Sequence, residues 1–170
     1  MRWLRPGGSL IAMVPHAYLP EIMQALSSGG LSYHWTLAYS MTGPDAKISQ
    51  KRVYVSWKPL LWYVKDKYAG HPVNDVITCT EPPDKAFHKW QQSESGFSEL
   101  IRRFARPDDV ICDPMMGSGT TGLAATALGC KFIGIENDPN MPSQRNVWPE
   151  TNDDFARNRR CRAYLHSQAA

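Results

Sequence analysis

The sequence predicts an α/β fold, and three observations near its C-terminal end carry this prediction. An apolar run over residues 110–112 leads into Asp113 and then into the stretch Pro-Met-Met-Gly-Ser-Gly-Thr-Thr-Gly. Small, helix-compatible residues follow over positions 123–128 and end at a glycine. A second apolar run, residues 131–136, closes on the acid Glu136. A strand, a glycine loop, a helix and a second strand in this order are typical of a parallel sheet that holds a nucleoside-containing ligand.

The glycines of this loop have a physical role. Gly117 and Gly119 allow a sharp turn and let a ligand approach the main chain, which a β-carbon would hinder. A helix that begins near Thr120 directs its free N–H groups and the positive end of its dipole at the loop. Glu136, at the end of the second strand, is placed to accept hydrogen bonds from ribose hydroxyls. The alternative is a glycine turn in an ordinary α/β protein that binds no ligand.

Asp113 discriminates between cofactors. A carboxylate at the tip of the first strand would repel a pyrophosphate, because like charges at close range in a partly desolvated site are costly. The same carboxylate favours a ligand that carries an ammonium and a sulfonium group. S-adenosylmethionine has both, together with a ribose for Glu136. An NAD-dependent oxidoreductase remains a remote alternative, and it predicts tight NAD binding with indifference to S-adenosylmethionine.

The two segments 113–121 and 128–138 resemble the cofactor-binding region of bacterial and phage DNA amino-methyltransferases. These enzymes transfer a methyl group from S-adenosylmethionine to the exocyclic nitrogen of adenine or cytosine. The resemblance implies a Rossmann-like class I methyltransferase sheet, circularly permuted in the β-type order, and it is closest to the phage-like branch. Permuted members carry a motif near His-x-x-x-Lys-Pro before the aspartate strand. Residues 88–93 occupy that place here, with Gln92 at the lysine position and Ser93 at the proline position.

The resemblance and the loop chemistry together define a cofactor site. Asp113 is expected to face the methionine ammonium, residues 117–120 to cradle the methionyl and ribose region, and Glu136 to bind the ribose hydroxyls. Asn137 is expected to contact the adenine. The full set of predicted cofactor-binding residues is Asp113, Pro114, Met115, Gly117, Ser118, Gly119, Thr120, Glu136, Asn137 and Gln92.

The N-terminal residues 3–15 resemble the family segment in which a helix ends at Pro-Gly-Gly and a central strand begins. In permuted members the catalytic Asp/Asn-Pro-Pro-Tyr/Phe tetrapeptide lies upstream of that segment, and no stretch of the 170 residues spells it. The catalytic residues are therefore unknown, and we expect the fold to be incomplete at its N-terminus. A missing N-terminal segment or a second chain would supply the motif. The alternative is a catalytically inactive remnant that still binds DNA or cofactor.

A basic and aromatic stretch lies away from the cofactor loop. The formal net charge is only +3, but basic residues between positions 47 and 68 alternate with tyrosines and tryptophans. Basic side chains bind phosphates and aromatic rings can stack on exposed bases. The resemblance to DNA amino-methyltransferases implies double-stranded DNA as the partner. Ordinary strands with solvated lysines are the alternative. The predicted DNA-binding residues are Lys51, Arg52, Trp57, Lys58 and Trp62.

We expect one methyltransferase domain over residues 1–170, with four parts. These are a remnant of the catalytic half (1–68), a short variable target-recognition segment (69–87), the cofactor-binding half (88–138) and a C-terminal turn and helix (139–170). Periodicity predicts strands over 9–14, 31–39, 110–112 and 131–136, and two strands within 53–65 joined at Lys58-Pro59. It predicts helices over 18–26, 97–104 and 153–166, and irregular chain over 42–50 and 69–87.

Composition excludes several other classes of protein. The chain is 42% hydrophobic, yet its apolar runs are far shorter than the ~20 residues of a membrane helix. The start of the chain has no apolar signal-peptide core. The four cysteines and five histidines lack metal-site spacing, so we expect no metal. Cys112 and Cys130 are expected to be reduced core residues, and a cytoplasmic location is the default.

Overall fold

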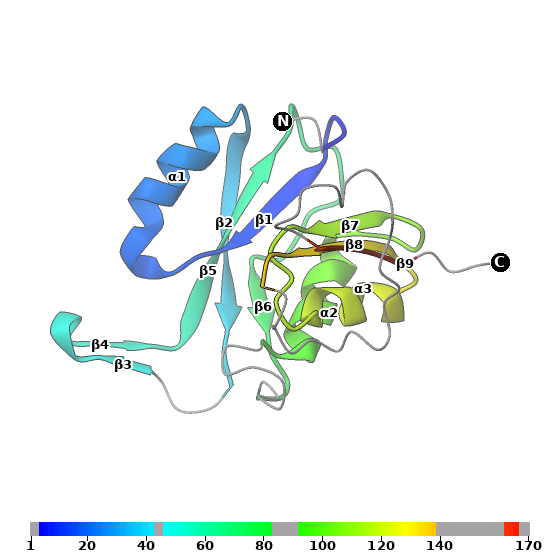
Figure 1. Cartoon of the computed structure of the whole chain (residues 1–170). Helices are drawn as coiled ribbons and strands as arrows, with labels where there is room; N and C mark the ends of the chain where they lie inside the picture. The colour runs from blue at the N-terminus through cyan, green and yellow to red at the C-terminus, as the bar shows by residue number, and fades with distance from the viewer. Residues whose placement is uncertain (1–3, 43–45, 83–91, 139–161, 167–170) are drawn as a thin grey trace. The chain divides into compact units, whose positions relative to one another are not determined.

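The computed structural model describes residues 4–42, 46–82, 92–138 and 162–166 (Figure 1). The chain divides into two compact units, Met1–Cys79 and Thr80–Ala170. The boundary falls inside the segment that the sequence marks as variable. The further division of the chain into four functional parts stays a prediction.

The first unit is built on a four-stranded sheet whose order is β1-β5-β2-β6. β5 (Trp57–Val64) pairs antiparallel with β1 (Ser9–Met13) on one side and with β2 (Ser32–Ser40) on the other. β6 (Val76–Thr78) joins parallel to β2 and is a short strand within the segment predicted to be irregular. Because β5 is central, its residues from position 59 to 64 are all buried, which explains the unbroken apolar run of that segment.

One helix covers part of this sheet. A short 3-10 turn, η1 (His16–Tyr18), leads into α1 (Leu19–Ser28), which lies beside the sheet (Figure 1). Side chains of α1 such as Ile22 and Leu26 pack against the buried cluster that includes Tyr63. The Tyr63 hydroxyl donates to a main-chain carbonyl of the helix, that of Met23, at 3.0 Å. The predicted helix over 18–26 is therefore confirmed, and the strands predicted over 9–14 and 31–39 are confirmed to within a residue or two.

A small hairpin extends from the first unit. β3 (Ala46–Ile48) and β4 (Val53–Val55) pair antiparallel around the 3-10 turn η2 (Ser49–Lys51), and Figure 1 shows them projecting from the sheet. The prediction of irregular chain over 42–50 was therefore wrong for β3. The predicted junction at Lys58-Pro59 was also wrong, since Pro59 lies inside β5. Proline is tolerated there because the ladder with β1 begins only at the next residue, Leu60, so that Pro59 lies at its end. Pro59 still contributes its carbonyl, which accepts from the Val14 N–H at 3.1 Å.

The second unit contains the predicted strand–loop–helix–strand. β7 (Val110–Asp113) and β8 (Lys131–Glu136) are parallel neighbours, and α3 (Thr120–Ala127) connects them. α2 (Glu94–Phe104) precedes β7, as the periodicity predicted, and the α/β fold class is confirmed. A third strand, β9 (Arg162–His166), pairs antiparallel with β8. The predicted C-terminal helix was wrong over 162–166, where pairing with β8 outweighs a weak helical pattern; residues 153–161 lie outside the described chain.

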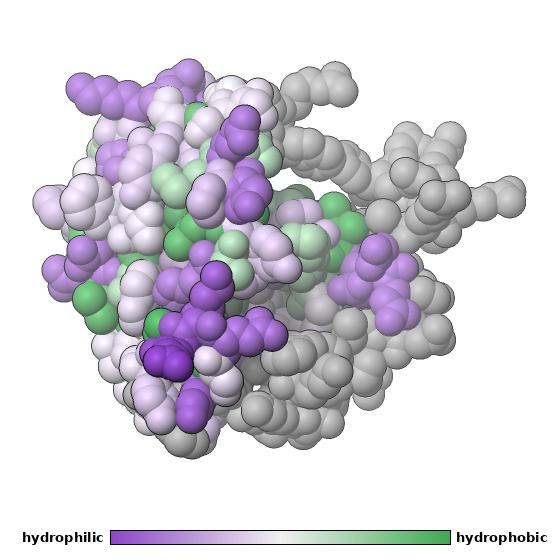
Figure 2. Space-filling view, turned by 90° about the vertical axis from the view of Figure 1, so that its left-hand side faces the viewer, coloured by the Kyte–Doolittle hydropathy of each residue, from purple (hydrophilic) through white to green (hydrophobic). Residues whose placement is uncertain are grey.

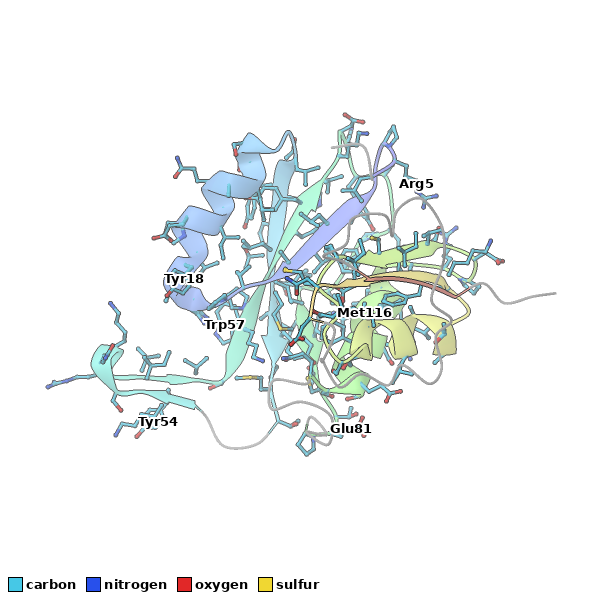
Figure 3. All side chains as sticks on the ribbon, viewed as in Figure 1. Arg5, Tyr18, Tyr54, Trp57, Glu81 and Met116 are labelled. Atoms are coloured by element: carbon cyan, nitrogen blue, oxygen red, sulfur yellow. The ribbon has the colours of Figure 1, made fainter. Side chains whose placement is uncertain are left out.

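The core of the second unit lies between the sheet and its two helices, which Figure 1 shows on the same face. Ile101, Met116 and Phe132 are among its buried members. Gly134 on β8 makes this packing possible, because a Cβ there would approach the Met116 sulfur to 2.2 Å and the Phe132 ring to 2.7 Å. Met116 thereby joins the glycine loop to the core, and Figure 3 shows it within this unit.

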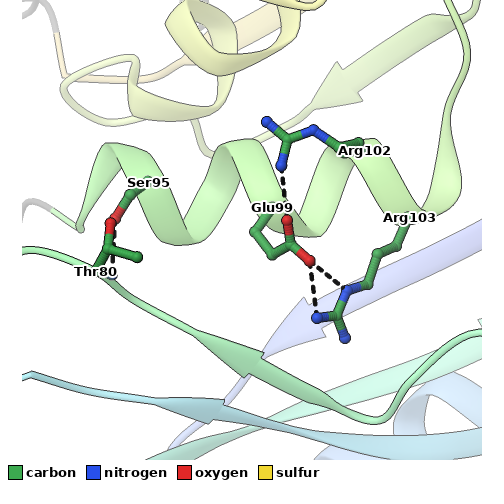
Figure 4. Close-up of polar contacts among 5 residues, drawn as sticks. All are labelled: Thr80, Ser95, Glu99, Arg102 and Arg103. Atoms are coloured by element: carbon green, nitrogen blue, oxygen red, sulfur yellow. Dashed lines mark hydrogen bonds and ion pairs between the residues drawn. The ribbon is translucent and has the colours of Figure 1, made fainter.

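The helix α2 is held by local polar contacts (Figure 4). Ser93 caps it by accepting a hydrogen bond from the Gly96 N–H at 3.4 Å. Glu99 accepts from Arg102 at 2.7 Å and from Arg103 at 2.8 Å. The hydrogen bond from Arg103, followed by the charge of Arg103 and then by the hydrogen bond and the charge of Arg102, holds the pKa of Glu99 below its usual value against the opposing effect of burial.

The structure bears on two expectations from composition, which concern membrane helices and cysteines. Among the described residues, none of the helices is long and apolar enough to cross a bilayer. Cys79, Cys112 and Cys130 are free thiols. Cys130 is buried in the core as expected, but Cys112 is exposed, because alternate residues of β7 point away from the face that α2 and α3 cover.

Candidate functional site

Two carboxylates stand at the same edge of the parallel strand pair. Asp113 ends β7 and Glu136 ends β8, and the register places Asp113 opposite Gly134. Ligands of open α/β sheets bind outside the carboxyl ends of the strands. The arrangement predicted from the sequence, two acids at this edge on either side of a glycine loop, is therefore present.

The glycine loop has a defined backbone path. The Met116 N–H donates to the Ile135 carbonyl at 3.0 Å, and the Gly119 N–H donates to the Met116 carbonyl at 2.9 Å. Gly117 and Gly119 have φ of 53° and 91°, a region that glycine enters without strain. A Cβ on Gly117 would meet no protein atom within 4 Å, so the positive φ is what favours glycine there.

Glu136 connects the loop to the end of β8. Its Oε2 accepts from the Gly117 N–H at 2.9 Å, and its Oε1 accepts from the N–H groups of Asn137 and Asp138, each at 2.9 Å. A carboxylate offers about four acceptor positions, so these three bonds leave capacity for a hydroxyl donor. The carboxylate therefore orders the loop and can still receive a ligand.

Asp113 is held from two sides. Its Oδ1 accepts from the Met115 N–H at 3.0 Å, and its Oδ2 accepts from the Thr121 hydroxyl at 2.5 Å. Sequence reasoning assigned Thr120 and missed Thr121. The sequence shows two adjacent threonines at the start of the helix. Which of them contacts Asp113 depends on which side chain points back toward β7, and the sequence does not reveal that direction.

Among the residues whose side chains the structure describes, no cation contacts either of these two acids. Backbone N–H groups and one hydroxyl are the donors that contact the carboxylates, and all of them are neutral. Arginine and lysine side chains pair instead with Glu99 and with Asp108. In the described ranges no three His, Cys, Asp or Glu side chains cluster as metal ligands. The site is therefore suited to a cationic organic ligand.

The other predicted cofactor residues divide by exposure. Pro114, Met115 and Asn137 are exposed, and Met115 leaves 85% of its surface open to contact. Ser118, Gly119 and Thr120 are buried, so they offer little side-chain surface to a ligand. The last of the predicted residues, Gln92, lies directly before the cap of α2. Contact of any of these residues with a ligand stays a prediction.

The predicted DNA-binding residues lie in the first unit, and Trp62 among them needs correction. Its ring is 4% exposed, packs beside His34 and Tyr68, and donates through Nε1 to Ser9 Oγ at 3.0 Å. A ring held in this way presents no face to a base, because residues 59–64 of the central strand β5 are buried. The burial of Trp62 therefore contradicts the prediction that this residue contacts DNA.

The remaining candidates lie on the hairpin and at the start of β5. Lys51 and Arg52 are exposed at the hairpin tip, and Tyr54 on β4 is 65% exposed (Figure 3). Figure 2, which views the side from which the hairpin projects, shows strongly hydrophilic side chains gathered there. Trp57 is 39% exposed and stands edge-on to His16, with ring centroids 4.7 Å apart. Lys58 is half-buried beside it.

The chain is similar to known protein sequences. The profile of the N6/N4 methyltransferase family, described as DNA methylase, matches residues 1–144. The type II methyltransferase M2.LlaDCHI of Lactococcus lactis subsp. cremoris is 29% identical over 154 residues, which cover 79% of this chain and 57% of that protein. M2.DpnII of Streptococcus pneumoniae is 28% identical over 152 residues, which cover 78% of this chain and 57% of that protein. The chain thus spans a little over half the length of these relatives.

Solved structures show the same fold. The M1.HpyAVI–SAM complex superposes with a TM-score of 0.70 and 27% identity, covering 81% of this chain and 72% of that one. TTHA0409 of Thermus thermophilus, complexed with S-adenosyl-L-methionine, superposes with a TM-score of 0.60 and 19% identity, covering 82% and 68%. At the lower identity the likeness concerns the fold alone. The α/β fold of this chain therefore matches that of DNA methyltransferase structures.

Replacing Glu136 with alanine should loosen the glycine loop even without any ligand. The Gly117, Asn137 and Asp138 amides lose their acceptor, so they should exchange hydrogen faster, and the free energy of unfolding should fall by about 1 kcal/mol or more. Amide hydrogen exchange followed by NMR measures the first effect, and urea unfolding measures the second. The control is Glu99→Ala on α2, which should leave these three amides unaffected. Unchanged exchange at Gly117 would contradict the proposed link.

Proposed function

Because this chain belongs to the N6/N4 DNA methylase family, we propose that its second unit binds S-adenosylmethionine for methyl transfer to an exocyclic amino group of DNA adenine or cytosine. One observation carries the proposal. Asp113 and Glu136 lie at the carboxyl ends of adjacent parallel strands, and neutral donors contact both carboxylates. Such a site attracts a cation and offers acceptors to a ribose. M1.HpyAVI, solved as a complex with SAM, supports the same cofactor.

The residues present fit this cofactor. Asp113 accepts hydrogen bonds from the ammonium group of the methionyl part, because the described residues that contact its carboxylate are neutral donors. Glu136 accepts from the ribose hydroxyls through its remaining capacity, and the exposed Asn137 contacts the adenine. The exposed Met115 supplies an apolar surface beside Asp113. When bound, the cofactor supplies an electrophilic methyl group on its sulfonium; the chain's own residues orient it.

The chemistry of the methyl acceptor requires further groups. An exocyclic base amine is a poor nucleophile because its lone pair is delocalised into the ring, so acceptors for its hydrogens and a stacking ring must position it. The catalytic tetrapeptide of the family is not spelled within these 170 residues. We propose that it comes from an upstream segment or a second chain, in the permuted order in which the catalytic part precedes the cofactor loop. The relatives are type II methyltransferases, which suits a role in restriction–modification; a phage-like origin stays a further proposal.

A second candidate function is a catalytically inactive protein that retains cofactor or DNA binding. The observation that favours it is that no stretch of these 170 residues spells the tetrapeptide. Both candidates share the cofactor site and differ only in turnover. An oxidoreductase that binds NAD is disfavoured, because Asp113 would face a pyrophosphate without a compensating cation among the described residues.

The hairpin is the proposed contact with double-stranded DNA. Residues 46–64 contain four basic residues and no acid, and two of the basic residues, Lys51 and Arg52, are exposed at the tip. The cation of Lys47 lies 5.9 Å from the centre of the Tyr54 ring, so this pair presents a charge and a planar surface together. Trp57 and Lys58 at the base of the hairpin would extend the same surface.

Replacing Asp113 with alanine should abolish cofactor binding. The ammonium group would lose its charged acceptor, so affinity for S-adenosylmethionine should fall at least about 100-fold by isothermal calorimetry. The matched control is Asp109→Ala, which removes a carboxylate on the turn before β7 that accepts from the Arg106 N–H. Unchanged affinity in the Asp113 variant would overturn the assignment of the site.

Neutralising the hairpin tip should weaken DNA binding without regard to sequence. For the double variant Lys51→Gln, Arg52→Gln we expect the slope of log affinity against log salt to become shallower by about 2, since two phosphate contacts are lost. Fluorescence anisotropy on duplex DNA across a salt series measures this slope. The control, Arg102→Gln, removes a cation already paired with Glu99. An unaltered slope in the double variant would place DNA elsewhere.

A methylation assay separates the two candidate functions. The chain alone should transfer little or no methyl group to unmethylated DNA, because the groups that position the base amine are missing, while it should still bind S-adenosylmethionine. Addition of a segment or chain that carries the tetrapeptide should restore transfer. Robust turnover by the chain alone would exclude the inactive protein and would show that other residues position the base.

A further inference from the structure

The hydroxyl of Thr121 contacts Asp113, and the proposed function gives this residue no role of its own. It donates to Asp113 Oδ2 at 2.5 Å, within the range of a hydrogen bond from a hydroxyl to a charged carboxylate. We propose that Thr121 is a positioning residue: it orients the Asp113 carboxylate toward the amino-acid part of the cofactor and so controls recognition of the ligand's ammonium group. This inference rests on the proposed function of the site.

The two bonds to Asp113 fix the plane of its carboxylate. The Met115 N–H donates to Oδ1 at 3.0 Å, from the loop, and Thr121 donates to Oδ2, from the helix. A carboxylate restrained on both oxygens cannot rotate freely about its last side-chain torsion. Each oxygen keeps a further acceptor position, and these remaining positions are the ones that an ammonium group can use.

The location of Thr121 explains how it reaches Asp113. It is the second residue of α3, and no side chain caps that helix at Gly119. A β-branched side chain in a helix has few rotamers, so its hydroxyl is directed with little loss of side-chain entropy. Thr126 in the same helix shows the usual alternative, because its hydroxyl donates back to the Gly122 and Leu123 carbonyls at 2.9 and 3.1 Å. Thr121 instead bonds outside the helix.

The chemical nature of the donor matters for the ligand. A lysine or arginine in the place of Thr121 would orient Asp113 but would also neutralise it and compete with the ammonium group. A hydroxyl orients the carboxylate and leaves its charge for the ligand. Ligands that share the adenosine but lack the amino-acid part should therefore be indifferent to Thr121.

The test compares two ligands and matched variants of the whole chain. S-adenosylhomocysteine carries the amino-acid part, whereas 5′-methylthioadenosine has the same thioether nucleoside without it. Thr121→Val keeps the shape and removes the hydroxyl, so calorimetry should find S-adenosylhomocysteine bound about 10-fold more weakly and 5′-methylthioadenosine unchanged. Thr121→Ser should restore the wild-type affinity. The control Thr126→Val removes a hydroxyl from the same helix and should alter neither affinity.

The outcomes are distinct. Wild-type affinity for S-adenosylhomocysteine in Thr121→Val would overturn the inference, and so would an equal loss for both ligands, which a merely structural role would cause. Wild-type chain that binds neither ligand would overturn the proposed function itself. If Thr121→Val fails to fold, Thr121→Ala takes its place with the same expectations. In an Asp113→Asn background, Thr121→Val should cost no further affinity, and an additive loss would also overturn the inference.

Discussion

The hydrogen bonds of the Glu136 carboxylate are the interaction on which the rest of the site depends. One carboxylate at the end of β8 accepts from the Gly117 N–H across the loop and from the two N–H groups that follow it. These bonds hold a loop whose positive φ angles at Gly117 and Gly119 few other residues would adopt. The neighbouring Met116 also holds the loop in place, because its side chain is buried in the core against Gly134, where a Cβ would leave no room for it. The glycine loop is thereby attached both to the end of β8 through Glu136 and to the core of the second unit through Met116.

The electrostatics of the site follow from the type of donor that it uses. The donors to Asp113 and Glu136 are backbone N–H groups and the Thr121 hydroxyl, which are neutral. Arginine, by contrast, satisfies Glu99 on α2 and lowers the pKa of that carboxyl. Among the side chains that the structure describes, these acids are therefore of two kinds: Glu99 is paired with cations, whereas no cation contacts Asp113 or Glu136. A ligand with a cationic amino-acid part matches the second kind.

The local elements were predictable where short-range pattern and long-range pairing agree. The β7–α3–β8 unit, the helix α2 and the strands β1 and β2 were found close to their predicted bounds, because apolar periodicity and glycine punctuation act along the chain. The hairpin strand β3 and the terminal strand β9 were missed, since each forms through pairing with a partner that short-range pattern does not reveal. Trp62 was assigned to DNA because its neighbours are basic, but its position in a central strand buries it.

The sequence by itself determined the chemistry of the candidate site: two acids, a glycine loop and a helix start, spaced so that a parallel strand pair brings both acids to one edge. It also determined the family, through residues that lie close together in the chain. Only the tertiary structure decided which side chains serve these acids, because Thr121 and Thr120 are equivalent in the sequence and differ in the direction they point from α3. The same holds for the aromatic residues of β5, where the sheet exposes Trp57 and buries Trp62. Burial and direction arise from contacts between distant segments, and for that reason the sequence pattern could not supply them.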